Sequence, residues 1–224
     1  MKKLTSILAA ILIIGLVLTG CENKQEADKT QEPEKAPVTA LDKIKKAGEI
    51  SIATNPDYPP FETIDDQGNV IGFDIDLSTA VAKELGVSPK FVKMSFDTII
   101  TAVKNGQTDL GVSAFSITEE RKQSIDFSDP YYSSSQVIMV LEDSGFTVKE
   151  DLAGKIIAVE LSTTGADAAK TITDAQVKAV DDYNVATMML KNGSAHAVVL
   201  DAPIAAEYVS RYNFVVLESP ESCH

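Results

Sequence analysis

The stretch AVKNGQTDLGVSA, residues 102–114, has the pattern of a helix that ends at a glycine and is followed by a short buried strand. A second stretch, MLKNGSAHAVVLD at residues 189–201, aligns with it without gaps through the shared Lys-Asn-Gly. Helix, glycine and strand in this order are common in α/β proteins, and this alone would explain the similarity. The other interpretation is two similar α/β lobes that present their strand ends, at Ala114 and Asp201, to a shared crevice.

The rest of the chain, from Leu41 onward, also alternates short β-rich runs with helical patterns. This alternation indicates α/β architecture with crossover helices. The predicted strands are 49–54, 90–94, 109–114, 155–160, 177–180 and 195–200, and the predicted helices are 74–86, 96–106, 164–171 and 184–193. The two lobes are expected to join near residues 131–141.

The N-terminus has Lys2 and Lys3, then an apolar run, then small residues before Cys21, which is typical of a secretory signal peptide. Leu-Thr-Gly-Cys at 18–21 resembles the lipobox of bacterial lipoproteins, which implies cleavage before Cys21 and lipidation of its sulfur. The alternative is an uncleaved apolar anchor. We expect a signal peptide at 1–20 and an extracytoplasmic protein anchored to the cell membrane by lipid.

Residues 21–40 are mostly polar and charged, and they are expected to form a lipidated, flexible tether. The chain has two cysteines, and a lipidated Cys21 cannot pair with Cys223, so no disulfide is expected. The net charge of −13 argues against binding to nucleic acid or broadly to anionic lipid.

No catalytic motif stands out in the sequence. His196 lies inside an apolar strand pattern and is expected to be structural, since its spacing fits no metal site. There is no nucleophile elbow, P-loop or dinucleotide fingerprint, so neither a cofactor nor a metal is expected.

Several residues could instead hold a zwitterion, which needs a cation or N–H donors for its carboxylate and a fixed carboxylate for its ammonium. Arg121 follows the predicted helix cap Thr118, although EERK taken alone is typical of a solvated charged face. Asp201 ends a strand and could simply cap the next helix. Tyr58 and Phe96 could face each other across a cleft, or pack in the core.

Four longer segments together resemble the polar amino-acid family of bacterial extracellular solute-binding proteins (family 3), the receptors of ABC importers. They are DYPPFETIDDQGNVIGFDIDL, SFDTIITAVKNGQTDLGVSAFSITEERKQSIDFSDPYY, DLAGKIIAVELSTTGADA and LKNGSAHAVVLDAPIAAEY. The resemblance implies two α/β lobes of the periplasmic-binding-protein-like type II fold, with a ligand cleft between them. It also implies delivery of an amino acid to the transmembrane subunits of a permease, with no catalysis.

Carried over by position, the resemblance implies that Arg121 binds the ligand carboxylate, assisted by Ser116 and by the N–H of Thr164. It implies that Asp201 and the carbonyl of Ala114 hold the ammonium. The remaining implied contacts are Tyr58 and Phe96 beside the ligand side chain and Ser113 on the same wall.

Other positions depart from the commoner family pattern. Asn55 stands where many relatives for cationic amino acids have Asp, which argues against arginine or lysine. Glu160 occupies a pocket position that is often apolar, Gln or Lys, and it could favour a cation. Ser162 replaces a usual Gly, and Phe96 a frequent Trp.

The expected domains are lobe 1 at 41–133 and lobe 2 at 134–224, in a chain expected to act as a monomer. By the resemblance, the second hinge and the C-terminal part of lobe 1 are expected to be absent, which would leave apolar surface exposed on lobe 1. Two other functions remain open: an enzyme on the same fold, such as a dehydratase with Glu160 as its acid or base, and a ligand-sensing module.

Overall fold

The structure is a computed structural model that describes residues 37–218. The predicted signal peptide, Cys21 and Cys223 lie outside the described residues. Within this range, none of the helices has both the length and the apolar character that crossing a bilayer requires.

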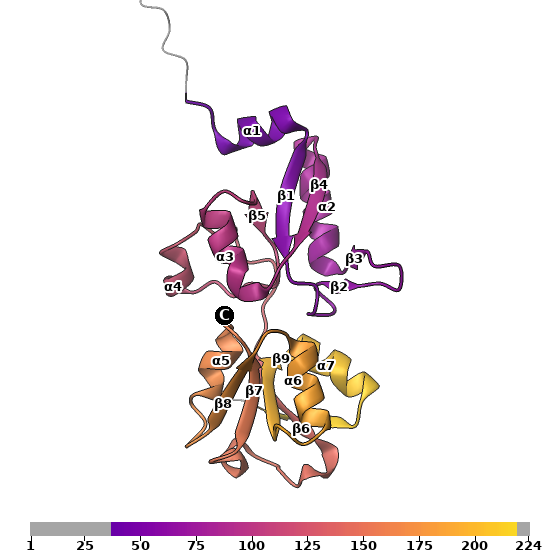
Figure 1. The fold of residues 1–224 in the computed structure, drawn as a ribbon, viewed down its shortest axis with the longest axis vertical. Helices are drawn as coiled ribbons and strands as arrows, with labels where there is room; N and C mark the ends of the chain where they lie inside the picture. Colours follow the sequence, from indigo (N-terminus) through magenta and orange to yellow (C-terminus); the bar gives the residue numbers. More distant parts are fainter. Residues whose placement is uncertain (1–36, 219–224) are drawn as a thin grey trace, which may run out of the picture. The chain divides into compact units, whose positions relative to one another are not determined.

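The first lobe is built on a three-stranded parallel sheet in the order β4-β1-β5 (Figure 1). Its helix α2 packs through Ala82 against Ile50 and Ile52 of the central strand. The elements of this lobe are α1 Ala40–Ala47, β1 Glu49–Thr54, β2 Thr63–Ile64, β3 Val70–Ile71, α2 Phe73–Leu85, β4 Ser88–Lys93, α3 Phe96–Lys104, β5 Leu110–Gly111 and α4 Glu119–Lys122.

Gly72 lies where the β2-β3 hairpin enters α2, and its backbone touches the loop that follows β1. A Cβ atom there would lie 2.3 Å from the carbonyl oxygen of Phe61, and the φ angle of Gly72 is 131°. Both conditions exclude a side chain. The contact lets the N–H of Asp74 donate to the carbonyl of Phe61 at 2.9 Å, so that Asp74 is buried at the start of α2.

The second lobe is built on a five-stranded mixed sheet in the order β10-β6-β9-β7-β8. Strand β6 runs antiparallel to β9 and β10, whereas β7 runs parallel to β8 and β9. The elements of this lobe are β6 Gln136–Leu141, η1 Glu142–Ser144, η2 Lys149–Leu152, β7 Ile156–Glu160, α5 Thr164–Ala169, β8 Gln176–Val180, α6 Tyr183–Lys191, β9 Ala197–Asp201, α7 Ala202–Arg211 and β10 Phe214–Glu218.

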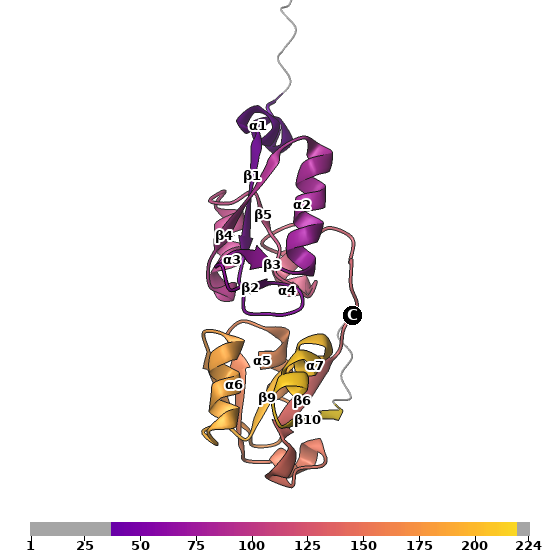
Figure 2. The same ribbon diagram turned by 90° about the vertical axis from the view of Figure 1, so that its right-hand side faces the viewer.

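Helices cover both faces of the second sheet (Figure 2). Leu190 of α6 and Tyr208 of α7 pack on the face that carries Val198 and Leu200, and Ala166 and Ala169 of α5 pack on the opposite face with Ile157 and Val199. Strands β6, β7 and β9 are therefore apolar on both faces, which explains why they are near-continuous hydrophobic runs.

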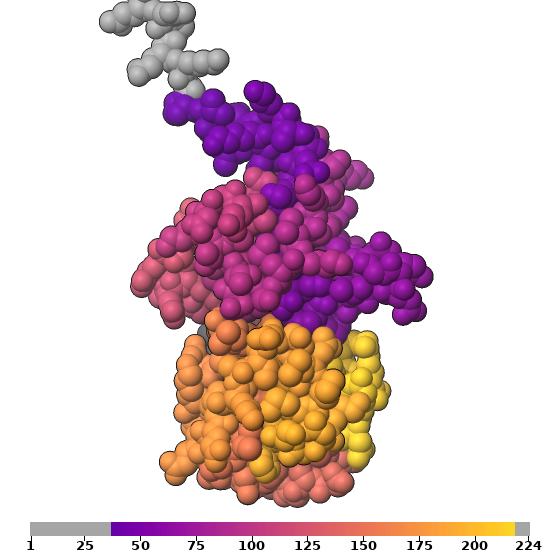
Figure 3. All heavy atoms as spheres, in the orientation of Figure 1, coloured from indigo at the N-terminus to yellow at the C-terminus, as the bar shows by residue number. Residues whose placement is uncertain are grey.

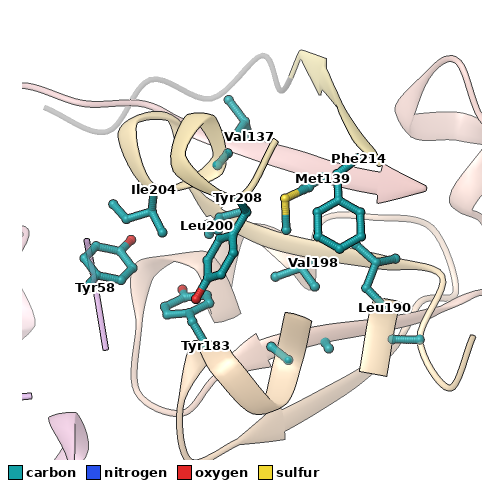
Figure 4. Packing of buried hydrophobic residues seen from close by; sticks show 14 of the residues in the cluster. Tyr58, Val137, Met139, Tyr183, Leu190, Val198, Leu200, Ile204, Tyr208 and Phe214 are labelled. Atoms are coloured by element: carbon teal, nitrogen blue, oxygen red, sulfur yellow. The ribbon is translucent and has the colours of Figure 1, made fainter. Parts of the chain in front are cut away.

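The first lobe also contributes to this core. Tyr58, from the loop after β1, is 8% exposed and packs in the same cluster as Tyr183 and Ile204 (Figure 4). Its ring centroid lies 5.1 Å from that of Tyr183. One face of the second lobe is thus completed by an aromatic side chain from the first.

The first lobe bears a wide apolar groove of about 960 Å³. Val81 and Leu110 line it and are exposed. Ile125, Phe127 and Tyr131, from the segment that leads to the second lobe, line its other side. Within the described residues, apolar side chains are therefore exposed on this lobe.

The predicted α/β class is confirmed, and the predicted strands and helices recur with small shifts at their ends. The prediction for 109–114 was too long, because β5 covers only Leu110–Gly111 and the chain turns at Ala114, whose φ is 45°. Helix α1 was not predicted. It begins at Ala40 because Thr39 and Asp42 form a capping box, so the folded region starts slightly before the expected Leu41.

Candidate functional site

A small cavity lies where residues at the carboxyl ends of strands in both lobes come together. Its free volume is about 20 Å³, room for about one water molecule. Figure 3 shows the atoms of the two lobes in contact on one face of the molecule. The cavity is lined by Asp57, Tyr58, Glu62, Phe96, Ser113, Ala114, Ser116, Arg121, Glu160, Thr163, Thr164, Gly165, Tyr183 and Asp201.

Most of the site residues predicted from the sequence are in this lining. They are Arg121, Asp201, Ser116, Ala114, Ser113, Thr164, Tyr58, Phe96 and Glu160. The remaining one, Asn55, is not part of the lining but contacts it, because its Nδ2 donates to Oε1 of Glu160 at 2.8 Å. The structure therefore brings the whole predicted set together, from positions up to 146 residues apart (Asn55 to Asp201).

Arg121 points into the cavity and is not part of a solvated face. Thr118 caps α4 by accepting from the N–H of Arg121 at 3.1 Å, as the sequence predicts. The guanidinium then donates from Nη1 to the carbonyl of Ser116 at 2.8 Å and from Nη2 to the carbonyl of Ser162, in the second lobe, at 2.9 Å. One planar cation thus contacts both walls of the cleft.

Two aromatic rings hold this guanidinium in place. Phe96 and Phe115 stack with their centroids 4.4 Å apart, and the Cζ of Arg121 lies 5.4 Å and 5.1 Å from the two centroids. Such cation–π contacts favour the charged form of the side chain in a partly dry site. Phe96 therefore meets Arg121, whereas Tyr58 packs with the second lobe's core.

Asp201 does not cap the helix that it precedes. It occupies the N-cap position of α7, but its side chain makes no capping bond. Instead, Oδ2 accepts a hydrogen bond of 2.5 Å from the hydroxyl of Tyr58. The alternative interpretation of Asp201 as a simple helix cap is therefore wrong, and its carboxylate faces the cleft.

Buried hydrogen bonds fix the loop that follows β5. The N–H of Asn55 donates to Oγ of Ser113 at 3.1 Å, and this hydroxyl donates to Oε1 of Glu62 at 2.8 Å. The N–H of Ala114 donates to Oδ2 of Asp74 at 2.7 Å. The carbonyl of Ala114, which the sequence nominates as a ligand contact, is thus set by two side chains behind the cavity wall.

Glu62 and Asp74 form a buried pair of acids, and both are fully buried. Burial raises the pKa of Glu62 well above its usual range, and the neighbouring Asp74 raises it further. Burial also raises the pKa of Asp74. Glu62 Oε2 and Asp74 Oδ1 have no other partner within the described residues, so the two carboxyl groups are well placed to share one proton.

Tyr131 joins this pair from the segment that connects the two lobes. Its hydroxyl donates to Oδ2 of Asp74 at 3.0 Å. Asp74 therefore holds both the cavity loop, through Ala114, and the first part of the inter-lobe connection, through Tyr131.

A second acidic pair, Asp57 and Glu160, lies on the cavity wall itself. Asp57 accepts from the N–H of Tyr183 at 2.8 Å and Glu160 accepts from Asn55. Burial, with the like charge of Asp57, raises the pKa of Glu160 to about 9, and burial, with the like charge of Asp182, raises the pKa of Asp57 to about 7.

The second lobe adds its share through the β7–α5 loop. Thr163 caps α5 by accepting from the N–H of Ala166, and the hydroxyl oxygens of Thr164 and Ser116 lie 3.3 Å apart across the lobes. Ser162, which stands where the family pattern has Gly, takes the left-handed conformation with φ of 63°. That conformation explains why a glycine is favoured at this position.

Sequence reasoning missed five lining residues: Asp57, Glu62, Thr163, Gly165 and Tyr183. Asp57 and Glu62 flank Tyr58 in the loop after β1, so the rule that ligands sit beyond strand ends could have found them. Tyr183 is harder to predict from the sequence, because it is the first residue of α6 and belongs to no recognisable motif.

The described residues contain no group of His, Cys, Asp and Glu side chains arranged to hold a metal. His196 has the structural role expected from the sequence, since its Nδ1 accepts from the N–H of Ile156 at 3.2 Å. Chemically, the cavity combines a cation on two rings, an opposing carboxylate, N–H and hydroxyl groups, and two protonatable acids.

Relatives of this chain include amino-acid-binding proteins. Residues 50–193 match the bacterial extracellular solute-binding proteins, family 3. A probable histidine-binding protein of Campylobacter jejuni subsp. jejuni serotype O:2 is 35% identical over 212 residues, which are 94% of this chain and 78% of the relative.

Two solved structures are similar as well. The arginine-bound form of truncated ArgBP from T. maritima is 39% identical, with a TM-score of 0.78 over 81% of this chain and 87% of that one. The ancestral amino-acid-binding protein AncCDT-1, a precursor of cyclohexadienyl dehydratase, is 39% identical, with a TM-score of 0.78 over 83% of each chain. With this fold, this cleft and these relatives, the chain belongs to the bacterial extracellular solute-binding proteins, family 3.

Proposed function

We propose that the chain is the extracytoplasmic substrate-binding component of an ABC importer, and that it binds a polar amino acid between its two lobes. The observation that carries this proposal is that Arg121 and Asp201, from opposite lobes, line one cavity. A guanidinium and a carboxylate on facing walls match the two charges of an α-amino acid.

In this proposal, the ligand carboxylate takes the two guanidinium N–H groups of Arg121 that now donate to the carbonyls of Ser116 and Ser162. The hydroxyl of Ser116 and the N–H of Thr164 assist. The ligand ammonium is held by Asp201 and the carbonyl of Ala114, and Ser113, Phe96 and Tyr58 line the walls. Each well-formed charge-assisted bond contributes about 1.5–3 kcal/mol.

Binding is proposed to require movement of the lobes. The free volume of about 20 Å³ is far smaller than an amino acid, and the Tyr58–Asp201 and Arg121–Ser162 bonds cross the cleft. The lobes must separate to admit a ligand, and bonds from both walls then favour closure around it. The ligand replaces contacts that the two walls make with each other.

The rest of the assembly is also a proposal. Residues 1–20 act as a signal peptide, Cys21 carries lipid, and residues 21–40 tether lobe 1 (41–133) and lobe 2 (134–224) to the membrane beside the permease subunits. The protein acts as a monomer without catalysis. Labelling of cells with a palmitate analogue tests the anchor, because Cys21→Ser would abolish incorporation whereas Cys223→Ser would not.

The binding function is tested by thermal shift of the full chain, purified in detergent, against the twenty common amino acids. We expect at least one L-amino acid to raise the melting temperature, and its D-enantiomer to fail because the ammonium and carboxylate would exchange places. A chain that no amino acid stabilises would refute the proposal. Product formation in the same mixtures would instead favour the dehydratase-like alternative.

A further inference from the structure

The cavity contains more acid than an α-amino acid backbone can use. Asp201 is enough for the ligand ammonium, yet Asp57 and Glu160 line the same cavity and are only 7% and 3% exposed. Within residues 37–218, neither of these two carboxyl groups forms an ion pair with a lysine or arginine. Buried acids normally have such a partner.

The surroundings of Glu160 are acidic on every side. Asp57 faces it from the loop after β1, Asp97 from α3 and Asp182 from the residue before α6. Tyr183 of α6 also lies close, and Asn55 donates to Oε1. Arg121, the cation of the cavity, donates to the carbonyls of Ser116 and Ser162 and not to Glu160.

Glu160 also has an unused acceptor. Its Oε1 accepts from Asn55 Nδ2, but no group in the described part of the chain donates to its Oε2. A carboxyl group that is almost completely buried, lines a cavity and keeps one oxygen free is placed to bind a donor that enters that cavity.

Resting on the proposed function, we propose that Glu160 and Asp57 form a subsite for a side-chain cation, so that the chain selects amino acids carrying a guanidinium or ammonium group. The Asn55 amide orients Glu160, and the two carboxyl groups face the incoming cation together. Asn55 thus supports cation binding indirectly. From the sequence alone, an Asn at this position, where many relatives for cationic amino acids have Asp, argues against a cationic ligand.

In this subsite, the side-chain cation of the ligand replaces a proton on the pair of acids. The pKa of Glu160 is raised to about 9 and that of Asp57 to about 7, so near pH 7 the free pair carries at least one proton. A cation bound between the two acids favours their ionised form, so the proton leaves to the solvent as the ligand enters. Charge in the cavity changes little, and affinity for the cation rises with pH until the free pair is ionised.

Titration calorimetry of the full chain in detergent tests this, with L-arginine and its neutral isostere L-citrulline as probes. At pH 7 we expect arginine to bind about 10- to 100-fold more tightly. Repeating the titration in buffers of different ionisation enthalpy should reveal release of about one proton per arginine and none per citrulline.

The variants Glu160→Gln and Asp57→Asn should each reduce the ratio of the two affinities by about tenfold. Glu160→Gln should also reduce the proton release. Glu84→Gln removes one exposed acid on α2 and serves as the matched control for charge. Because each affinity ratio compares two ligands on one variant, a general loss of stability does not imitate the effect.

Equal affinities for arginine and citrulline, with no proton release, would overturn the subsite and leave the proposed function intact. Tight arginine binding that Glu160→Gln and Asp57→Asn leave unchanged would also overturn it. If the thermal-shift screen finds no amino acid and neither probe binds, the proposed function itself fails.

Discussion

The hydroxyl of Tyr58, on the loop after β1, donates a hydrogen bond of 2.5 Å to Oδ2 of Asp201 at the end of β9. The N–H of Asp201 donates back to the same hydroxyl at 3.3 Å. Two residues 143 apart in sequence therefore form a closed contact across the cleft, at the atom proposed to receive the ligand ammonium.

Tyr58→Phe removes this contact and leaves the ring in its pocket against Tyr183. We expect a loss of about 1.5–3 kcal/mol in the free energy that favours the closed arrangement, because the acceptor is charged. Small-angle scattering of the ligand-free chain should show a larger radius of gyration. Tyr212→Phe, at a tyrosine on the second lobe that is 40% exposed, is the matched control and should leave the radius unchanged. An unaltered radius for Tyr58→Phe would contradict the prediction.

Arg121→Lys keeps the charge but loses the planar pair of donors. We expect the affinity for the amino acid found in the screen to fall about 10- to 100-fold, since an ammonium cannot form two parallel bonds to a carboxylate. Calorimetry gives the dissociation constant. Lys122→Gln, whose lysine pairs with Glu119 on the surface, should bind as the wild type does. A change of less than twofold for Arg121→Lys would remove Arg121 from the ligand site.

Gly72→Ala tests the close contact between α2 and the loop after β1. The new Cβ would lie 2.3 Å from the carbonyl oxygen of Phe61, and we expect the free energy of unfolding to fall by about 3 kcal/mol or more. Gly68 also has a positive φ, 86°, but a Cβ there would have nothing within 4 Å, so for Gly68→Ala only the backbone cost of about 1–2 kcal/mol should remain. Urea denaturation measures the free energy of unfolding of both variants. Equal losses would show that the backbone around Phe61 moves to accommodate the new Cβ and that the close contact has no cost of its own.

Glu62→Gln tests the buried acid pair through pH. Burial and Asp74 raise the pKa of Glu62 above 4.5, so the folded chain holds a proton that the unfolded chain loses. The free energy of unfolding therefore falls as pH rises from about 4.5 toward the folded pKa, and Gln removes this slope, by up to about 1.4 kcal/mol per pH unit. Urea denaturation between pH 5 and pH 8 gives the slope. Glu84→Gln should keep the wild-type slope, and an equally steep slope in Glu62→Gln would refute the shared proton.

The local features of the fold could be predicted because they depend on neighbours in sequence. The cap at Thr118, the Gly-terminated helices and the apolar strands β6, β7 and β9 are all visible as patterns. Asp201 could be nominated because it ends strand β9, where ligands bind in α/β folds, and Arg121 because it follows the helix cap Thr118.

The contacts across the cleft could not be predicted in the same way. Asn55 and Glu160 are 105 residues apart, and neither residue alone shows that an amide of one lobe orients an acid of the other. The packing of Tyr58 in the second lobe could not be predicted either, because it depends on how the two lobes meet and not on the local sequence pattern. The buried pair of Glu62 and Asp74 requires the close approach at Gly72, which sequence shows only as a glycine.

The bond from Tyr131 to Asp74 also locates the pivot of the molecule. It fastens the connecting segment to the first lobe as far as Tyr131, and β6 fastens it to the second lobe from Gln136. Tyr132 also packs on Phe61 of the first lobe, and the carbonyl of Ser135 accepts from the N–H of Ala202 in the second. Within the described chain, rotation of one lobe against the other is thereby confined to Ser133 and Ser134. The lobes are thus joined by a short polar hinge. Its first-lobe end is fixed to Asp74, the same acid that positions the loop carrying Ala114.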